Sequence, residues 1–263
     1  MATVNARTPP MMDDHASEIE DLQHLMNGLL STLSHDLRTP LSAITGWLYL
    51  LESEKLDAAA KKRALEKIRA NVDEQVRLID DILLLSRSKT GHLTLDPAVI
   101  LPDAPLFAAL EKVRPAAIAA KVKLNATKVE QIGKVIADSE HLGRVFEILL
   151  SHAVKSTPPG GAVETAIRVQ DSHIVITIAD NGKGVIPAEL PFVFDPFTKK
   201  NGGSGDAYAG AGRSLMLAKT LVEIQNGQLL AASPGPGLGA TFTVLLSGIA
   251  ADRATNQPVA EKN

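Results

Sequence analysis

The sequence lacks cysteine, is poor in aromatic residues and has no basic surplus, and each absence excludes a class of function. Without cysteine, the 263-residue chain has no disulfide, thiolate metal site or cysteine nucleophile. Lys plus Arg number 27 against 30 Asp plus Glu, and this balance argues against a general nucleic-acid binder. Aromatic residues make up only 3%, so aliphatic side chains must fill the core, as is typical of helix packing.

Long hydrophobic runs are also missing. No apolar window reaches the roughly 18 residues that a membrane-spanning helix needs, so we expect no membrane insertion. Residues 1–15 lack the basic and then apolar stretches of a secretory signal and are typical of a flexible arm. These features predict a cytoplasmic protein.

Residues 16–90 carry two long amphipathic patterns separated by a short charged turn near residues 53–57. Apolar residues recur at steps of three and four along both patterns, which predicts two helices in an antiparallel hairpin. Such a hairpin does not bury its apolar stripes alone. We therefore expect a homodimer in which two hairpins form a four-helix bundle.

Residues 91–248 mix short patterns of both periods and predict an α/β or α+β domain, followed by a polar tail at 249–263. Period-2 patterns predict strands and period-3.6 patterns predict helices. The expected strands are 122–124, 133–136, 162–169, 173–179 and 240–247, and the expected helices are 139–156 and 213–225.

Three motifs carry potential chemistry. The first is Ser34–Leu41, where the imidazole of His35 is a good phosphoryl acceptor and the adjacent carboxylate of Asp36 can orient it or take its proton. The second is Asp180–Val185, directly after an expected strand, where a carboxylate can accept a hydrogen bond from an exocyclic amine between glycines that admit a flat base. Taken alone, that second motif is more typical of a turn.

The third motif is glycine-rich. Residues 202–205 and 210–212 lead into an expected helix, and backbone amides at a helix N-terminus form a natural phosphate cradle. A surface loop is the alternative interpretation.

The string SHDLRTPL at residues 34–41 resembles the H-box of sensor histidine kinases. The resemblance implies that His35 is phosphorylated, that Asp36 assists as base and that Thr39 positions water for a phosphatase reaction on the partner. It extends over about residues 20–248. It implies that residues 91–248 form an α/β-sandwich ATP-binding domain of the histidine kinase, gyrase and Hsp90 type.

The nucleotide-binding boxes of the same family resemble the other two motifs. By that resemblance Asp180 reads the adenine amino group, and Thr241 lies near the adenine. Phe194–Phe197 resembles the phenylalanine box that packs the lid. The remaining expected pocket and phosphate contacts are Gly182, Gly184, Lys199, Gly210 and Gly212.

One box departs from the family. Its two asparagines, four residues apart, are replaced by Ile148 and His152, while Lys155 matches. Mg²⁺ prefers oxygen ligands, so His152 is a poor substitute, yet it is the metal candidate on this helix. Glu147, one position before Ile148, lies about 100° around the helix from it and can help to hold the metal only after some rearrangement. The resemblance therefore implies ATP with Mg²⁺ or Mn²⁺ as cofactors and weakens the expected metal site.

We expect a sensor histidine kinase that phosphorylates His35 and passes the group to a response regulator, with input from an upstream sensor protein. A pseudokinase or histidine phosphotransfer adaptor is the main alternative, favoured by the substituted box. A coiled-coil scaffold leaves the 34–41 string unexplained, and an ATPase chaperone or topoisomerase has no need of the hairpin. A zinc site between His141 and His152 is excluded because about three helical turns separate them.

Overall fold

The computed structural model describes residues 34, 37–53, 56–127, 133–195 and 211–249. Within this chain, two compact units separate: Met1–Leu83 with Asp195–Gly212, and Leu84–Phe194 with Arg213–Asn263. Among the described residues, no helix combines the length and the hydropathy that crossing a membrane requires.

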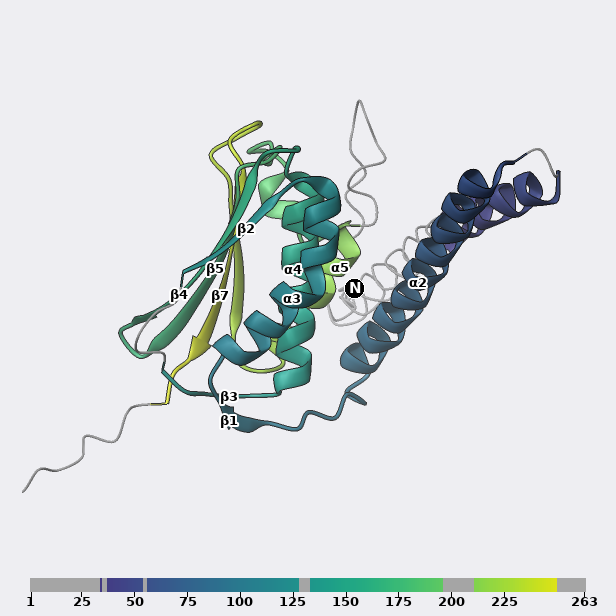
Figure 1. The fold of residues 1–263 in the computed structure, drawn as a ribbon. Helices are drawn as coiled ribbons and strands as arrows, with labels where there is room; N and C mark the ends of the chain where they lie inside the picture. Colours follow the sequence, from purple (N-terminus) through teal and green to yellow (C-terminus); the bar gives the residue numbers. More distant parts are fainter. Residues whose placement is uncertain (1–33, 35–36, 54–55, 128–132, 196–210, 250–263) are drawn as a thin grey trace, which may run out of the picture. The chain divides into compact units, whose positions relative to one another are not determined.

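The first unit contains the predicted helical hairpin (Figure 1). Residues 37–52 are helical, and α2 (Ala58–Lys89) follows after a short turn. Asp57 begins α2 as an N-cap, because its Oδ1 accepts a hydrogen bond from the Ala60 amide at 2.6 Å. The second predicted helix is thus confirmed, and so is the first over residues 37–52, whereas its predicted start lies outside the described residues.

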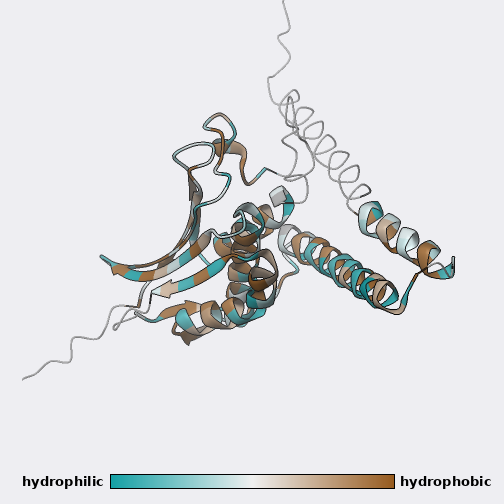
Figure 2. Ribbon diagram, turned by 45° about the horizontal axis from the view of Figure 1, so that its top comes forward, coloured by the Kyte–Doolittle hydropathy of each residue, from teal (hydrophilic) through white to brown (hydrophobic). Residues whose placement is uncertain are grey.

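One face of α2 exposes a line of large apolar side chains in the single chain. Figure 2 shows that hydrophobic and hydrophilic residues alternate along this helix. The exposed apolar residues of α2 recur at steps of three, four and seven, and these are Leu65, Val72, Val76, Ile79 and Leu83. Apolar residues at this spacing form a stripe that a partner surface can cover.

The second unit is an α/β sandwich. Its five-stranded sheet has the order β2-β4-β5-β7-β6, in which only β2 and β4 run parallel. The strands are β2 (Lys123–Thr127), β4 (Ala162–Gln170), β5 (His173–Asp180), β6 (Gln228–Ala232) and β7 (Ala240–Ser247). The helices α3 (Asp103–Ala120), α4 (Ser139–Ser156) and α5 (Ala211–Glu223) cover one face of the sheet (Figure 1).

The core lies between this sheet face and the three helices. Alternate residues of β7 point inward, and Phe242, Val244 and Leu246 are buried, as the period of two in a strand requires. On α4 the buried residues recur at helical spacing and include Leu142, Val145, Phe146, Leu149 and Ala153. This packing fixes where α4 ends relative to β5 and β7.

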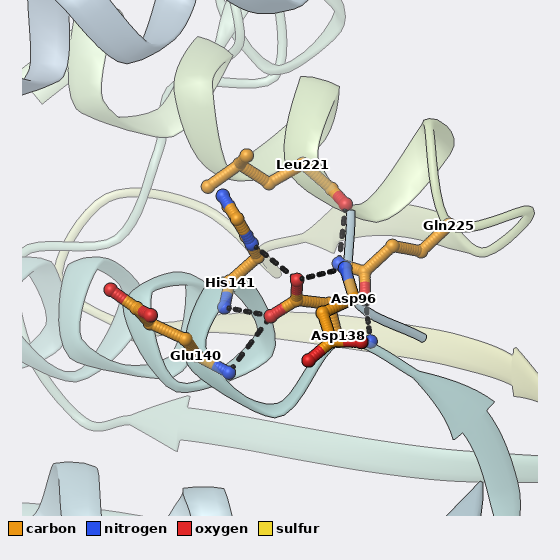
Figure 3. A network of polar contacts seen from close by, with 6 residues as sticks. All are labelled: Asp96, Asp138, Glu140, His141, Leu221 and Gln225. Carbon is orange, nitrogen blue, oxygen red and sulfur yellow. Dashed lines mark hydrogen bonds and ion pairs between the residues drawn. The ribbon is translucent and has the colours of Figure 1, made fainter. Parts of the chain in front are cut away.

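A second, two-stranded sheet joins β1 (Ala98–Ile100) antiparallel to β3 (Val135–Ala137). Beside it, the buried carboxylate of Asp138 caps α4 by accepting from the amides of Glu140 and His141, both at 3.0 Å (Figure 3). Its Oδ2 accepts from the Asp96 amide at 2.8 Å, and its own amide donates to Gln225 Oε1 at 2.8 Å. One residue therefore joins the segment before β1, the start of α4 and the segment after α5.

The sequence patterns missed α3, β6 and the three-residue β1 of this unit. The 18-residue α3 was not predicted because it is rich in alanine and carries Pro105 and Pro115. β6 was also missed, since it is only five residues long and is defined by its pairing with β7. Predicted ends of other elements differ by a few residues, as for α5, which begins at Ala211 rather than 213.

Candidate functional site

The carboxylate of Asp180 is the centre of the candidate site. It lies at the last residue of β5, where it pairs with Ala240 of β7, and only 8% of the residue is exposed. Oδ1 accepts a hydrogen bond from the Gly182 amide at 2.9 Å, whereas Oδ2 is buried with no hydrogen-bond partner among the described residues. Burial raises the pKa of Asp180, although the backbone amides of Gly182 and Ala240 oppose that shift.

The turn after Asp180 packs backbone against backbone. A Cβ on Gly182 would overlap the Ser156 carbonyl at the end of α4, and the Lys183 amide donates to that same carbonyl at 3.0 Å. Gly184 has a φ of +64°, and a Cβ there would overlap the Gly235 carbonyl. The two glycines are therefore required because protein backbone approaches them closely, and their predicted approach to a flat base stays a prediction.

A loop that the sequence analysis did not single out supports this turn. The Ser233 hydroxyl donates to the Gly239 carbonyl at 2.7 Å and accepts from the Val185 amide at 2.9 Å. Nearby, the Gly239 amide donates to the Gly182 carbonyl at 3.1 Å. Residues 233–239 and 182–185 are thus tied together, and no local pattern in the sequence identifies Ser233 for this role.

An aromatic group lies next to the turn. The ring of Phe242 on β7 packs edge-on against His152 of α4, with centroids 5.3 Å apart, and against Phe194, with centroids 6.2 Å apart. Lys219 of α5 places its Nζ 5.5 Å from the centre of the Phe194 ring. Phe194, from the predicted phenylalanine box, therefore contacts the core at the point where the described chain breaks off after Asp195.

Burial lowers the pKa of His152 to about 4, and the nearby charge of Lys155 adds to that shift. The imidazole is consequently neutral at pH 7. Ile148, one helical turn earlier, is 6% exposed and belongs to the hydrophobic core. Lys155 is exposed near the end of the helix. The α4 positions that the resemblance assigned to metal ligands therefore hold a core aliphatic and a neutral ring.

The structure locates some of the other predicted residues and leaves others outside its described ranges. Thr39 is exposed on the helix at 37–52, and Gly212 lies in the first turn of α5. Thr241 pairs with Ala179, one residue away from the pairing of Asp180. The predicted residues outside the described ranges are His35, Asp36, Lys199 and Gly210.

These features fit an adenine base and do not fit a metal held by α4. An amino group donates readily to a buried carboxylate oxygen that lacks a partner. Among the described residues, no three or more His, Asp or Glu side chains gather as metal ligands. Asp180 therefore offers an acceptor that suits an amino group, whereas α4 offers no oxygen ligand at its two predicted positions.

Comparison with known families agrees with this geometry. Residues 137–248 match the family described as histidine kinase-, DNA gyrase B-, and HSP90-like ATPase, so the second unit carries an ATPase domain of that class. Residues 25–91 match the His Kinase A (phospho-acceptor) domain. The two matches occur in the order found in one kind of protein: the chain belongs to the sensor histidine kinases.

Individual relatives are similar over most of this chain. Sensor protein DivL of Caulobacter vibrioides is 29% identical over 88% of this chain and 29% of its own length. The alginate biosynthesis sensor protein KinB of Pseudomonas aeruginosa is 31% identical over 81% of this chain and 35% of its own. Signal transduction histidine-protein kinase BaeS of Escherichia coli is 28% identical over 88% of this chain and 49% of its own. The chain thus spans less than half the length of these relatives.

Solved structures share the fold. The Acinetobacter baumannii histidine kinase AdeS aligns with a TM-score of 0.60 and 21% identity, covering 81% of this chain and 98% of that one. Full-length ShkA in complex with AMPPNP aligns with a TM-score of 0.60 and 25% identity, covering 84% of this chain and 46% of that one.

Proposed function

We propose that this sensor histidine kinase transfers the γ-phosphoryl group of ATP to His35 and from there to an aspartate of a response regulator. The observation that carries the nucleotide part is the buried, unpartnered Oδ2 of Asp180 beside the closely packed Gly182 and Gly184. In this proposal residues 16–90 form the dimerisation and phosphoacceptor domain, and residues 91–248 form the ATP-binding domain.

The proposed reaction uses the residues of the 34–41 string. An imidazole nitrogen of His35 attacks the γ-phosphorus, the bond to the bridging oxygen breaks, and ADP leaves. Asp36 takes the imidazole proton, which keeps the attacking nitrogen nucleophilic. Thr39, exposed on its helix, positions water for hydrolysis of the phosphorylated regulator.

The remaining proposed contacts hold the nucleotide. Asp180 accepts from the adenine amino group, and Thr241 lies near the same base because its strand pairs with that of Asp180. Lys155, Lys199, Gly210 and Gly212 serve the phosphates in this proposal. Phosphoryl transfer depends mainly on positioning and electrostatic stabilisation, which are the tasks given to these groups.

We further propose that the chain acts as a homodimer through the helical hairpin. The exposed apolar side chains of α2 support this assembly, because a second hairpin packed against them removes them from water.

Labelled ATP tests the kinase proposal. The wild type should gain acid-labile, alkali-stable label with Mg²⁺ or Mn²⁺, and His35→Ala should gain none. His24→Ala is the matched control, since it removes another histidine of the same amphipathic pattern, and it should label like the wild type. Equal labelling of His35→Ala and the wild type refutes the assignment of the phosphoacceptor.

A second candidate is a pseudokinase or phosphotransfer adaptor that receives phosphate from a phosphorylated receiver. The burial of Ile148 where the family carries an asparagine favours it. The two candidates differ in one assay. An adaptor labels His35 from a phosphorylated receiver domain without ATP and gains no label from ATP, whereas the kinase gains label from ATP.

A further inference from the structure

The part of α4 that approaches the Asp180 turn differs from a metal-binding surface. The backbone amide of Lys183 donates a hydrogen bond to the carbonyl of Ser156, so the end of this helix contacts the turn directly. Ile148, His152 and Lys155 follow one another at steps of four and three and therefore share one face of the helix. None of these three side chains has an oxygen atom, which is the ligand that Mg²⁺ prefers.

The nearest carboxylate on α4 is committed elsewhere. Glu147 forms ion pairs with Lys112 of α3, through Oε1, and with Arg144, whose Nη1 lies 3.3 Å from Oε2. Together with Ala108 and Gly143, Glu147 and Lys112 line a groove between α3 and α4. Turning Glu147 toward His152 would break both ion pairs and leave two cations without that partner.

His152 does not replace the missing oxygens. Its ring packs edge-on against Phe242, which fixes the ring plane inside the aromatic group. A neutral imidazole supplies a nitrogen, and nitrogen ligands suit Zn²⁺ or Ni²⁺ better than Mg²⁺.

We infer that this chain binds an adenine nucleotide through its base, and that the affinity does not depend on a divalent cation. The inference rests on the proposed nucleotide site. The base meets a prebuilt acceptor at Asp180, while α4 holds the core side chain of Ile148 and the imidazole of His152 at the two positions where the resemblance places metal ligands. Positive charge near the phosphates comes from the chain itself, from Lys155 on α4 and from the buried Arg213 in the first turn of α5.

Calorimetric titration of the full chain with AMPPNP tests the inference in two buffers, one with excess Mg²⁺ and one with EDTA. We expect dissociation constants that agree within about threefold. Binding that is at least tenfold weaker in EDTA overturns the inference and leaves the proposed nucleotide site standing. Binding in neither buffer overturns both.

A variant that adds the oxygen ligand gives an independent readout. His152→Asn should acquire an affinity at least fivefold higher in Mg²⁺ than in EDTA, and the further change Ile148→Asn should widen that ratio. His152→Leu is the matched control, because it removes the imidazole without adding an oxygen, and its affinities in the two buffers should agree within about threefold. If His152→Asn is folded by circular dichroism and its affinities in the two buffers agree, the metal preference does not depend on this position and the reasoning fails.

Discussion

The carboxylate of Asp138 allows a stability effect to be worked out bond by bond (Figure 3). Asp138→Ala removes the acceptor for the amides of Glu140 and His141 at the start of α4, and losing such an N-cap costs about 1 kcal/mol. It also leaves the Asp96 amide without its acceptor, which costs about 1 kcal/mol more, and it removes the contact between Oδ2 and His141 Nδ1 at 2.9 Å. The expected loss in free energy of unfolding is therefore at least about 2 kcal/mol.

Amide hydrogen exchange on peptides of α4, followed by mass spectrometry, measures this loss in the ATPase unit alone. A loss of about 2 kcal/mol speeds exchange by about 30-fold where global or subglobal opening controls it. Glu140→Ala is the matched control, because it removes an exposed acid from the same helical turn and keeps the Asp138 cap. Exchange of Asp138→Ala within twofold of the wild type would refute the reasoning.

The same site has a defined pH dependence. Burial acts to raise the pKa of Asp138, but hydrogen bonds from Asp96 and His141 outweigh it and hold the pKa below the ordinary value of 3.8. The ionised carboxylate therefore stabilises the fold above pH 3.8, and this contribution is lost as the pH falls through the lowered pKa. Asp138→Asn keeps a capping oxygen without ionising, so its stability deficit should be largest near neutral pH and shrink in acid. An equal deficit at pH 7 and pH 3 contradicts this account.

Three further predictions test the site and the assembly. Gly239→Ala should abolish nucleotide binding or folding, because Gly239 has a φ of +76° and its added Cβ would overlap the Asp180 carbonyl. Gly237 has a similar φ of +78° but open space around it, so Gly237→Ala should cost only about 1 kcal/mol in urea unfolding. Nucleotide affinity should fall as the pH is lowered through the raised pKa of Asp180, since only the ionised carboxylate is a pure acceptor, and Asp180→Asn should lose this pH dependence in calorimetry. Val76→Asp should raise the dissociation constant of the dimer at least tenfold in sedimentation, because Val76 lies on the apolar stripe of α2 and is 52% exposed in the single chain. Ala70→Asp, away from that stripe, should leave the dissociation constant unchanged. A binding-competent Gly239→Ala, a flat pH profile or an unaffected Val76→Asp dimer would each contradict its prediction.

Periodicity predicted the elements whose burial follows a regular pattern. The bounds 139–156 and 240–247 match α4 and β7 because each presents an apolar face to one core and a polar face to water. α3 is less regular, since apolar and small residues surround much of it. The sequence could not indicate β6 strongly, because a short edge strand depends on its partner for definition.

The candidate site likewise combines residues that a local motif predicts with residues whose roles depend on the assembled fold. Asp180, Gly182 and Gly184 are contiguous in the chain, so a local motif contains them and predicts a tight turn after a strand. Ser233 acts across 48 residues on Val185, and its role exists only once β5, β6 and β7 are assembled. The direction of Glu147 likewise depends on Lys112 of α3, an element that the patterns missed.

The Ser233 hydroxyl has a consequence for base selectivity. Its single proton goes to the Gly239 carbonyl, and its lone pairs face the amides of Val185 and Gly235 at 2.9 and 3.3 Å, so its bonding capacity is filled. Ser233 consequently holds the turn beside Asp180 in place, and the turn resists a shift that would change the direction of the carboxylate. Guanine would place a carbonyl oxygen where adenine places an amino group, and two acceptors would then face each other with no slack in the backbone to separate them. In the proposed nucleotide site, rigidity at a residue remote from the ligand would thereby discriminate between purines.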